Sequence, residues 1–158
     1  MNYISVDMLS DFEFHDAEFI LDSFDNRHLT VKAACLNIHK DAAQNSHETD
    51  MEIASARITF KQFHLLTYEP GRAWKQDEAG NFYSDETQII LSGDDASTRF
   101  LTQLKAGITI LDLGRKEAFT YYIDAMSKEP FFTVCFTFES VVIEWDNYKK
   151  EAWYTSRK

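Results

Sequence analysis

The fold class is decided by the stretch "AEFILDSFDNRHLTVKAAC", residues 17–35, in which two runs of alternating apolar residues flank a turn. Alternation with a period of two places one set of side chains on the buried face of a strand. With the turn at "DNR", Leu21 lies opposite Val31 and Phe19 lies opposite Ala33, so the two apolar faces coincide. The stretch therefore predicts an antiparallel β-hairpin, with a bulge or strand end after its last residue.

The same register, extended backwards through "FEFHDAEF", residues 12–19, pairs His15 with Asn37. Alternation then puts His15 on the inner face, while Asp16 and Glu18 point the other way. A strand would separate the histidine from both acids. We interpret His15 as an inward polar residue bonded to Asn37 or to backbone; the alternative is a polar group at the mouth of a barrel cavity.

Strand patterns recur along the rest of the chain, and one segment has helical spacing. The helix is expected at about 94–105, within "DDASTRFLTQLKAG", and Gly107 is placed to end it. The expected strands lie in residues 51–70 with a kink near 61–63, and in 87–92, 108–113, 117–126, 131–138, 141–145 and 151–155, with a break at 139–140. A small hairpin is expected around Gly80–Asn81. We predict one mostly β domain, residues 1–158, built as an antiparallel β-barrel or sandwich with one short helix.

Composition limits the classes of function. The chain has 26 acidic and 16 basic residues and a formal net charge of −10, which argues against nucleic acid and favours a basic protein partner. No run approaches the ~18 apolar residues of a membrane span, and the start does not resemble a signal peptide. Cys35 and Cys135 lie far apart without neighbours at metal-ligand spacing. A cytoplasmic protein with two free thiols is expected.

The stretch "HETDME", residues 47–52, is the densest cluster of ligand-type side chains. A zincin helix needs a second histidine four residues after His47, and Met51 stands there. The calcium-loop pattern lacks its glycine. We therefore predict no metal and no cofactor; His39, His47 and Asp50 are the only candidates for a metal site.

Two polar loops, residues 39–52 and 71–86, carry much of the acidic charge. Loops on a rigid scaffold are where binding residues tend to lie. We predict a non-catalytic interaction protein that meets a basic partner through these loops. The candidate contact residues are Glu48, Asp50, Asp77 and Glu78.

A small-ligand-binding β-barrel is the alternative, with its pocket near His15 and Asn37 and an enzymatic function left open. The case for catalysis is thin, because Ser92 lacks the G-x-S-x-G elbow and no pattern pairs Cys135 with a base. The glycines are scattered singly, so no phosphate-binding loop is indicated. We favour a protein that is not an enzyme.

The "FHDAEF" strand, its hairpin and the late "IEWDNY…AWY" resemble small uncharacterised bacterial β-rich proteins, some of which are immunity proteins of polymorphic toxin systems. The similarity covers the two ends of the chain. It implies a compact, acidic, cytoplasmic bacterial protein that binds another protein, and it assigns no site residue.

Overall fold

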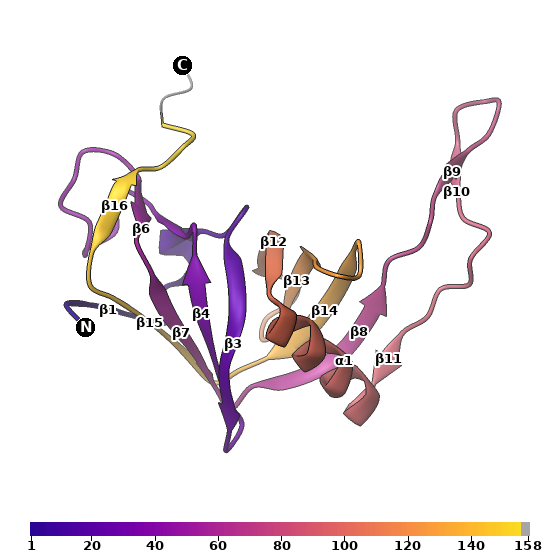
Figure 1. Ribbon diagram of the computed structural model, residues 1–158, viewed down its shortest axis with the longest axis horizontal. Coiled ribbons are helices and arrows are strands. Elements are labelled where there is room, and N and C mark those ends of the chain that lie inside the picture. Colours follow the sequence, from indigo (N-terminus) through magenta and orange to yellow (C-terminus); the bar gives the residue numbers. More distant parts are fainter. Residues whose placement is uncertain (156–158) are drawn as a thin grey trace.

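A ten-stranded antiparallel sheet is the largest unit of residues 1–155, the part of the chain that the computed structural model describes (Figure 1). In order across the sheet, the strands are β1 (Tyr3–Val6), β15 (Ser140–Trp145), β7 (Ala56–Lys61), β4 (His28–Ala34), β3 (Glu18–Asp25), β12 (Ile108–Arg115), β13 (Tyr121–Met126), β14 (Phe132–Thr137), β8 (His64–Pro70) and β11 (Leu91–Ser92). The predicted mostly β, antiparallel class is confirmed.

Two smaller sheets and two helical segments complete the described residues. A four-stranded sheet has the order β16 (Tyr148–Glu151), β6 (Met51–Ile53), β5 (Asn37–Ile38) and β2 (Phe12–Glu13). A two-stranded hairpin pairs β9 (Lys75–Gln76) with β10 (Phe82–Tyr83), as predicted around Gly80–Asn81. The helical segments are the 3₁₀ turn η1 (Leu9–Asp11) and the α-helix α1 (Gly93–Ala106).

The β3–β4 hairpin has the predicted register. Phe19 pairs with Ala33 and Leu21 pairs with Val31, and a bulge follows directly after this second pair. The two central turn residues both have left-handed φ values, 51° and 65°, which is the geometry that suits the twist of a two-residue hairpin. Strand β4 ends one residue before Cys35, whose φ is 57°, so the predicted strand end is also confirmed.

The inward placement of His15 is wrong. Asp16 has a φ of 69°, so residues 15 and 16 form a turn and β3 begins only after it. The strand before the turn, β2, places Glu13 opposite Asn37. His15 is exposed at the turn, because a left-handed residue interrupts the alternation that the sequence pattern assumes.

Two long segments bend at the same place. Only Gln62 and Phe63 separate β7 from β8, and Gln62 has a φ of 54°. Two residues likewise separate β14 from β15. The hydrogen-bonded pair β7–β15 therefore continues into the hydrogen-bonded pair β8–β14, with a bend between them. The predicted kink at 61–63 is confirmed, and the break predicted at 139–140 lies one residue earlier, at 138–139. The bends turn one half of the sheet toward the other.

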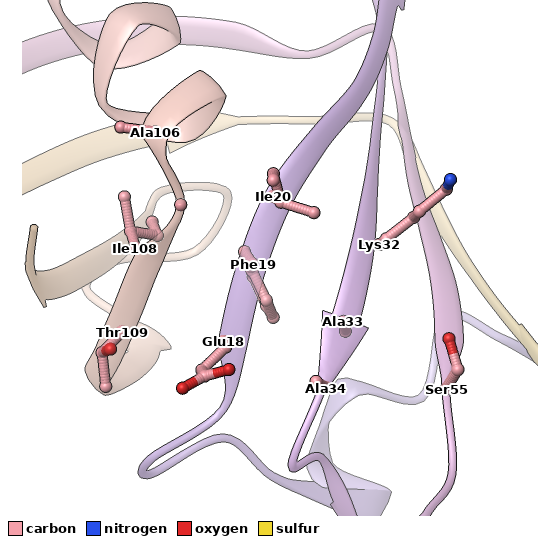
Figure 2. Close-up of a pocket in the computed structure, with 11 residues that line it drawn as sticks. Glu18, Phe19, Ile20, Lys32, Ala33, Ala34, Ser55, Ala106, Ile108 and Thr109 are labelled. Carbon is pink, nitrogen blue, oxygen red and sulfur yellow. The ribbon is translucent and has the colours of Figure 1, made fainter.

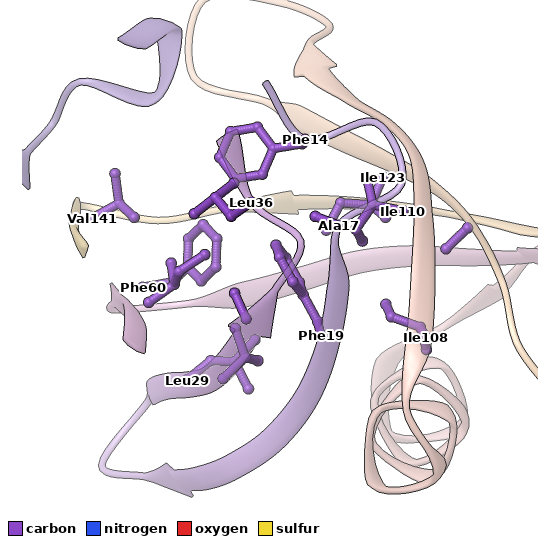
Figure 3. Packing of buried hydrophobic residues seen from close by; sticks show 14 of the residues in the cluster. Phe14, Ala17, Phe19, Leu29, Leu36, Phe60, Ile108, Ile110, Ile123 and Val141 are labelled. Atoms are coloured by element: carbon purple, nitrogen blue, oxygen red, sulfur yellow. The ribbon is translucent and has the colours of Figure 1, made fainter. Parts of the chain in front are cut away.

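The core lies between these halves. Figure 3 shows Leu29, Phe60 and Phe19 of one half gathered toward Ile110 and Ile123 of the other, and all five are almost fully buried. Each such side chain contributes about 1.5–3 kcal/mol on leaving water.

The outermost strands β1 and β11 do not pair with each other, and no closed barrel is found within residues 1–155. The barrel-or-sandwich detail is therefore not confirmed.

Helix α1 matches the segment predicted at about 94–105. Its buried face repeats every four residues through Ala96, Phe100 and Leu104. Gly107 ends the helix with a φ of 92°, and its N–H donates to the Leu104 carbonyl at 3.1 Å. The helix packs against β8 and β3, and the Phe100 ring stacks on Phe63 at 6.2 Å.

Two expected strands differ from the structure. Of residues 87–92 only Leu91 and Ser92 form a strand, because residues 87–90 do not pair with β8 or with any other strand of the described chain. The last strand is β16 and not 151–155, because Tyr148 pairs with Ile53 and residues 153–155 form a turn.

Candidate functional site

The carboxylate of Asp50 joins the loop of residues 39–50 to the end of the described chain. His39 Nδ1 lies 3.1 Å from Asp50 Oδ2, and the Tyr154 hydroxyl donates to the same oxygen at 2.6 Å. The Lys40 N–H donates to the other oxygen at 2.8 Å. A carboxylate with three donors is braced in place, which leaves little of it for a metal or a partner.

The pKa values of this cluster follow from the same contacts. Partial burial works to raise the pKa of the Asp50 carboxyl, but the three hydrogen bonds outweigh it and the pKa lies below its usual range. Burial, followed by the hydrogen bond to Asp50, raises the pKa of the Tyr154 hydroxyl. Asp50 is therefore ionised and Tyr154 is a neutral donor near pH 7.

His47 does not join His39 and Asp50. Its ring packs edge-on against the Tyr148 ring, with the centroids 5.2 Å apart and the planes at 82°. Its backbone N–H is held by the Asn45 side chain at 2.9 Å. Among residues 1–155, no three His, Cys, Asp or Glu side chains gather in a way that could hold a metal ion. The structure thus brings two of the three candidate metal ligands together.

His15 and Asn37 are not brought together. His15 Nδ1 lies 2.8 Å from the Leu111 carbonyl oxygen, and Nε2 lies 3.6 Å from Asp16 Oδ1. The hydrogen bond to that carbonyl is the main reason why the pKa of His15 is raised; burial lowers it slightly and nearby carboxylates raise it. Asn37 is only 1% exposed and lies opposite Glu52 in β6. Neither residue lines the cleft described next.

The cleft has a volume of about 430 Å³ and lies where β3 meets β12 (Figure 2). It exists because only two residue pairs join these strands, Phe19 with Ile108 and Glu18 with Thr109. Its other lining residues are Ile20, Lys32, Ala33, Ala34, Ser55, Ala106 and Gly107. The volume falls in the range of ligand sites, but such sites need a few polar groups that converge. Lys32 extends past the cleft toward Asp22, 3.8 Å away, so the ligand-binding alternative gains little support.

A hairpin projects from the sheet, and Figure 1 shows it extending well away from the other elements. We call residues 71–90, which connect β8 to β11 and include β9 and β10, the arm. Asp77 closes its tip by accepting the Asn81 N–H at 2.8 Å and donating its own N–H to the Asn81 carbonyl at 2.9 Å. Gly80 supplies the positive φ, 86°, that this turn requires. Glu78 is exposed at the tip.

The arm exposes an unusual share of large apolar side chains. Phe82 is 73% exposed, and the other exposed members are Trp74, Tyr83, Ile89 and Ile90. Several large apolar side chains exposed on one projecting element are typical of an interaction site in a folded protein. The sequence pattern predicts an acidic loop here, and the exposure of the apolar residues was not predicted. The signal was their presence inside a stretch that is otherwise polar.

The fold and the arm together define a mostly β protein with antiparallel sheets and a projecting apolar hairpin. No family model matches the chain, and no curated protein or solved structure is significantly similar to it. Within residues 1–155 we find no helix with the length and hydrophobicity needed to span a bilayer.

Proposed function

We propose that this protein is a non-catalytic interaction domain that binds a basic protein partner, with the arm as its main contact. The supporting observation is the combination of exposed aromatic residues and acidic charge on one projecting element. The arm includes the acidic loop at 71–86 and extends it to residue 90. An immunity protein in the bacterial cytoplasm is the setting that the resemblance suggests.

Charge and apolar surface have separate roles in this proposal. The arm carries four acidic residues, Asp77, Glu78, Asp85 and Glu86, against Arg72 and Lys75, and Lys75 forms an ion pair with Asp85; Asp94 and Asp95 follow in the first turn of α1. Such a surface accelerates encounter with a basic partner. Aromatic side chains buried at the centre of an interface supply most of the affinity. Phe82 and Trp74 are placed to act as these anchors.

The second acidic loop, residues 39–52, makes a smaller contribution to the proposed binding of a basic partner. Asp50 is occupied by its three internal donors, whereas Glu48 is exposed and carries no ion pair among the described residues. Glu48 and Asp41, which is also exposed and has no ion pair among the described residues, are therefore the carboxylates of this loop that are open to a partner.

The test starts with capture from the source lysate at low salt and continues with the purified pair. We expect an association rate that falls steeply as salt rises, and binding about tenfold or more weaker in Phe82→Ala. Glu78→Lys should slow association without loss of stability. The matched control is Phe119→Ala, because Phe119 is 80% exposed and lies outside the arm. A rate that does not change with salt, or equal losses in Phe82→Ala and Phe119→Ala, would count against the proposal.

A further inference from the structure

The two outer edges of the ten-stranded sheet are treated differently. At β1, one side chain of the loop of residues 39–50 reaches the edge: Gln44 Nε2 donates to the Ile4 carbonyl at 2.9 Å. At β11, only Leu91 and Ser92 pair with β8, and within residues 1–155 the outer side of β11 has no strand neighbour. A loop side chain therefore occupies one carbonyl of the β1 edge, whereas the β11 edge is bare.

The bare edge continues into the arm. Residues 87–90 lie in no strand, and the backbone groups of Thr87, Gln88 and Ile89 form no hydrogen bond within the described part of the chain. Their φ values are all negative, so nothing in the backbone prevents an extended conformation. An edge with unpaired N–H and C=O groups is a template for another strand.

This edge lacks the devices by which proteins discourage pairing. Natural edges carry lysines, prolines or bulges, and residues 87–92, "TQIILS", contain no lysine or proline. Ile89 and Ile90 are both more than half exposed. Two neighbouring isoleucines point to opposite faces of a strand, so a paired strand would gain apolar contacts on both faces.

We propose that the partner contributes a β-strand that pairs with residues 87–92 and extends the sheet beyond β11. The inference rests on the proposed function and specifies how the partner is held. The main-chain hydrogen bonds would supply affinity, and side chains that alternate along the strand would supply specificity.

The charges around the edge define the chemistry of that strand. The segment "DETQIILSGDD", residues 85–95, has two acidic residues at each end and none in the middle; Asp85 also forms an ion pair with Lys75 of the arm, and Asp94 and Asp95 lie in the first turn of α1. A matching strand is apolar or β-branched in its centre and basic at its ends. A second copy of this chain is disfavoured, because antiparallel self-pairing would bring Asp85 and Glu86 of one copy near Asp94 of the other.

The test uses a defined probe with the whole protein. The probe is a peptide with a central Thr-Val repeat flanked by two lysines at each end, and amide hydrogen exchange is followed by NMR. We expect slower exchange at alternate residues of 87–92 on binding, because only every second amide of an edge faces the new strand. A probe with a central proline should bind about tenfold or more weakly, and one with glutamates at its ends should bind weakly too.

The matching protein variants are Ile89→Pro and Ile90→Pro. Only one of these two neighbouring amides faces outward, so the two variants should differ in their loss of probe affinity, whereas Phe119→Ala, a change at an exposed residue outside the arm, should leave probe binding unchanged. If a proline variant does not fold, the proline-containing probe with the unaltered protein decides the matter.

Equal binding of the lysine-flanked probe and its proline version would overturn strand addition, as would absence of protection at 87–92. Either result would leave the arm's salt-dependent binding of a basic partner standing. Partner binding that does not depend on salt and is unaffected by Phe82→Ala would contradict the proposed function itself.

Discussion

The Tyr154 hydroxyl donates a hydrogen bond to Asp50 Oδ2 at 2.6 Å, although the two residues are 104 positions apart in the sequence. Because His39 meets the same oxygen, the cluster fastens the loop of residues 39–50 to the segment that follows β16. A set of side chains that looks like metal ligands in the sequence acts here as a structural brace.

Removal of the Tyr154 hydroxyl should weaken this brace. We expect Tyr154→Phe to lower the free energy of unfolding by about 1 kcal/mol, since a partly buried carboxylate loses one donor. Urea denaturation would measure the change as a lower midpoint with an unchanged slope. Tyr83→Phe is the control, because Tyr83 is exposed and its hydroxyl has no hydrogen-bond partner among the described residues. Equal midpoints for the two variants would contradict the prediction.

The lowered pKa of Asp50 predicts a pH dependence of stability at the acid end. A carboxyl whose folded pKa lies below its unfolded value, about 3.9, stabilises the fold above that value and loses this contribution as pH falls through the folded pKa. The difference in unfolding free energy between the unaltered protein and Asp50→Asn should therefore be largest near pH 7 and shrink below pH ~4. A difference that stays constant from pH 7 to pH 3 would be inconsistent with an ionised brace.

The contribution of His15 to stability should depend on pH in the opposite direction to that of Asp50. Its raised folded pKa means that any stabilisation is fully present below the unfolded value of 6.5 and is lost as pH rises through the folded pKa. The effect on stability is small, because the side chain is half exposed and solvent screens it. An NMR titration should place the pKa of His15 above the ordinary histidine value of 6.5. A pKa below that value would show that the ring does not donate to the Leu111 carbonyl.

The root of the arm depends on Gly71. A Cβ at this position would lie 2.6 Å from the Phe131 carbonyl oxygen, and the Gly71 N–H donates to that same oxygen at 2.7 Å. We expect Gly71→Ala to destabilise the protein by about 1–3 kcal/mol, because backbone has to move to admit the methyl group. Gly80→Asn at the arm tip is the comparison: asparagine tolerates left-handed φ, and the nearest atom to a Cβ there is 3.6 Å away. Thermal unfolding of both variants would decide; equal losses would show that the close approach at Gly71 is unimportant.

Local patterns predicted much of the fold. The register of Phe19 with Ala33, the helix around Phe100 and the kink at 61–63 all follow from periodicity and turn residues within short windows. The failures have local physical causes. The left-handed φ of Asp16 carries no clear sequence signal and turned His15 outward, and residues 87–90 have a strand-like composition without a neighbouring strand.

The candidate site was less predictable than the fold. Glu78 lies exposed as expected, whereas Asp77 closes a turn and Asp50 is taken up by internal donors. The apolar residues of the arm, Phe82 above all, were not predicted. A large apolar side chain predicts burial in general, and only the position of its element decides whether anything covers it.

The sequence by itself determined the strand and helix periodicity, the antiparallel hairpin, the acidic charge and the free, widely spaced cysteines. Only the tertiary structure decided that β3 meets β12 through two residue pairs, that Tyr154 reaches Asp50, and that the edge at β11 is left bare while a loop side chain occupies one carbonyl of the β1 edge. Alternation states which face of a strand is buried, but it does not state which strand lies beside it. That choice depends on packing between segments far apart in the chain.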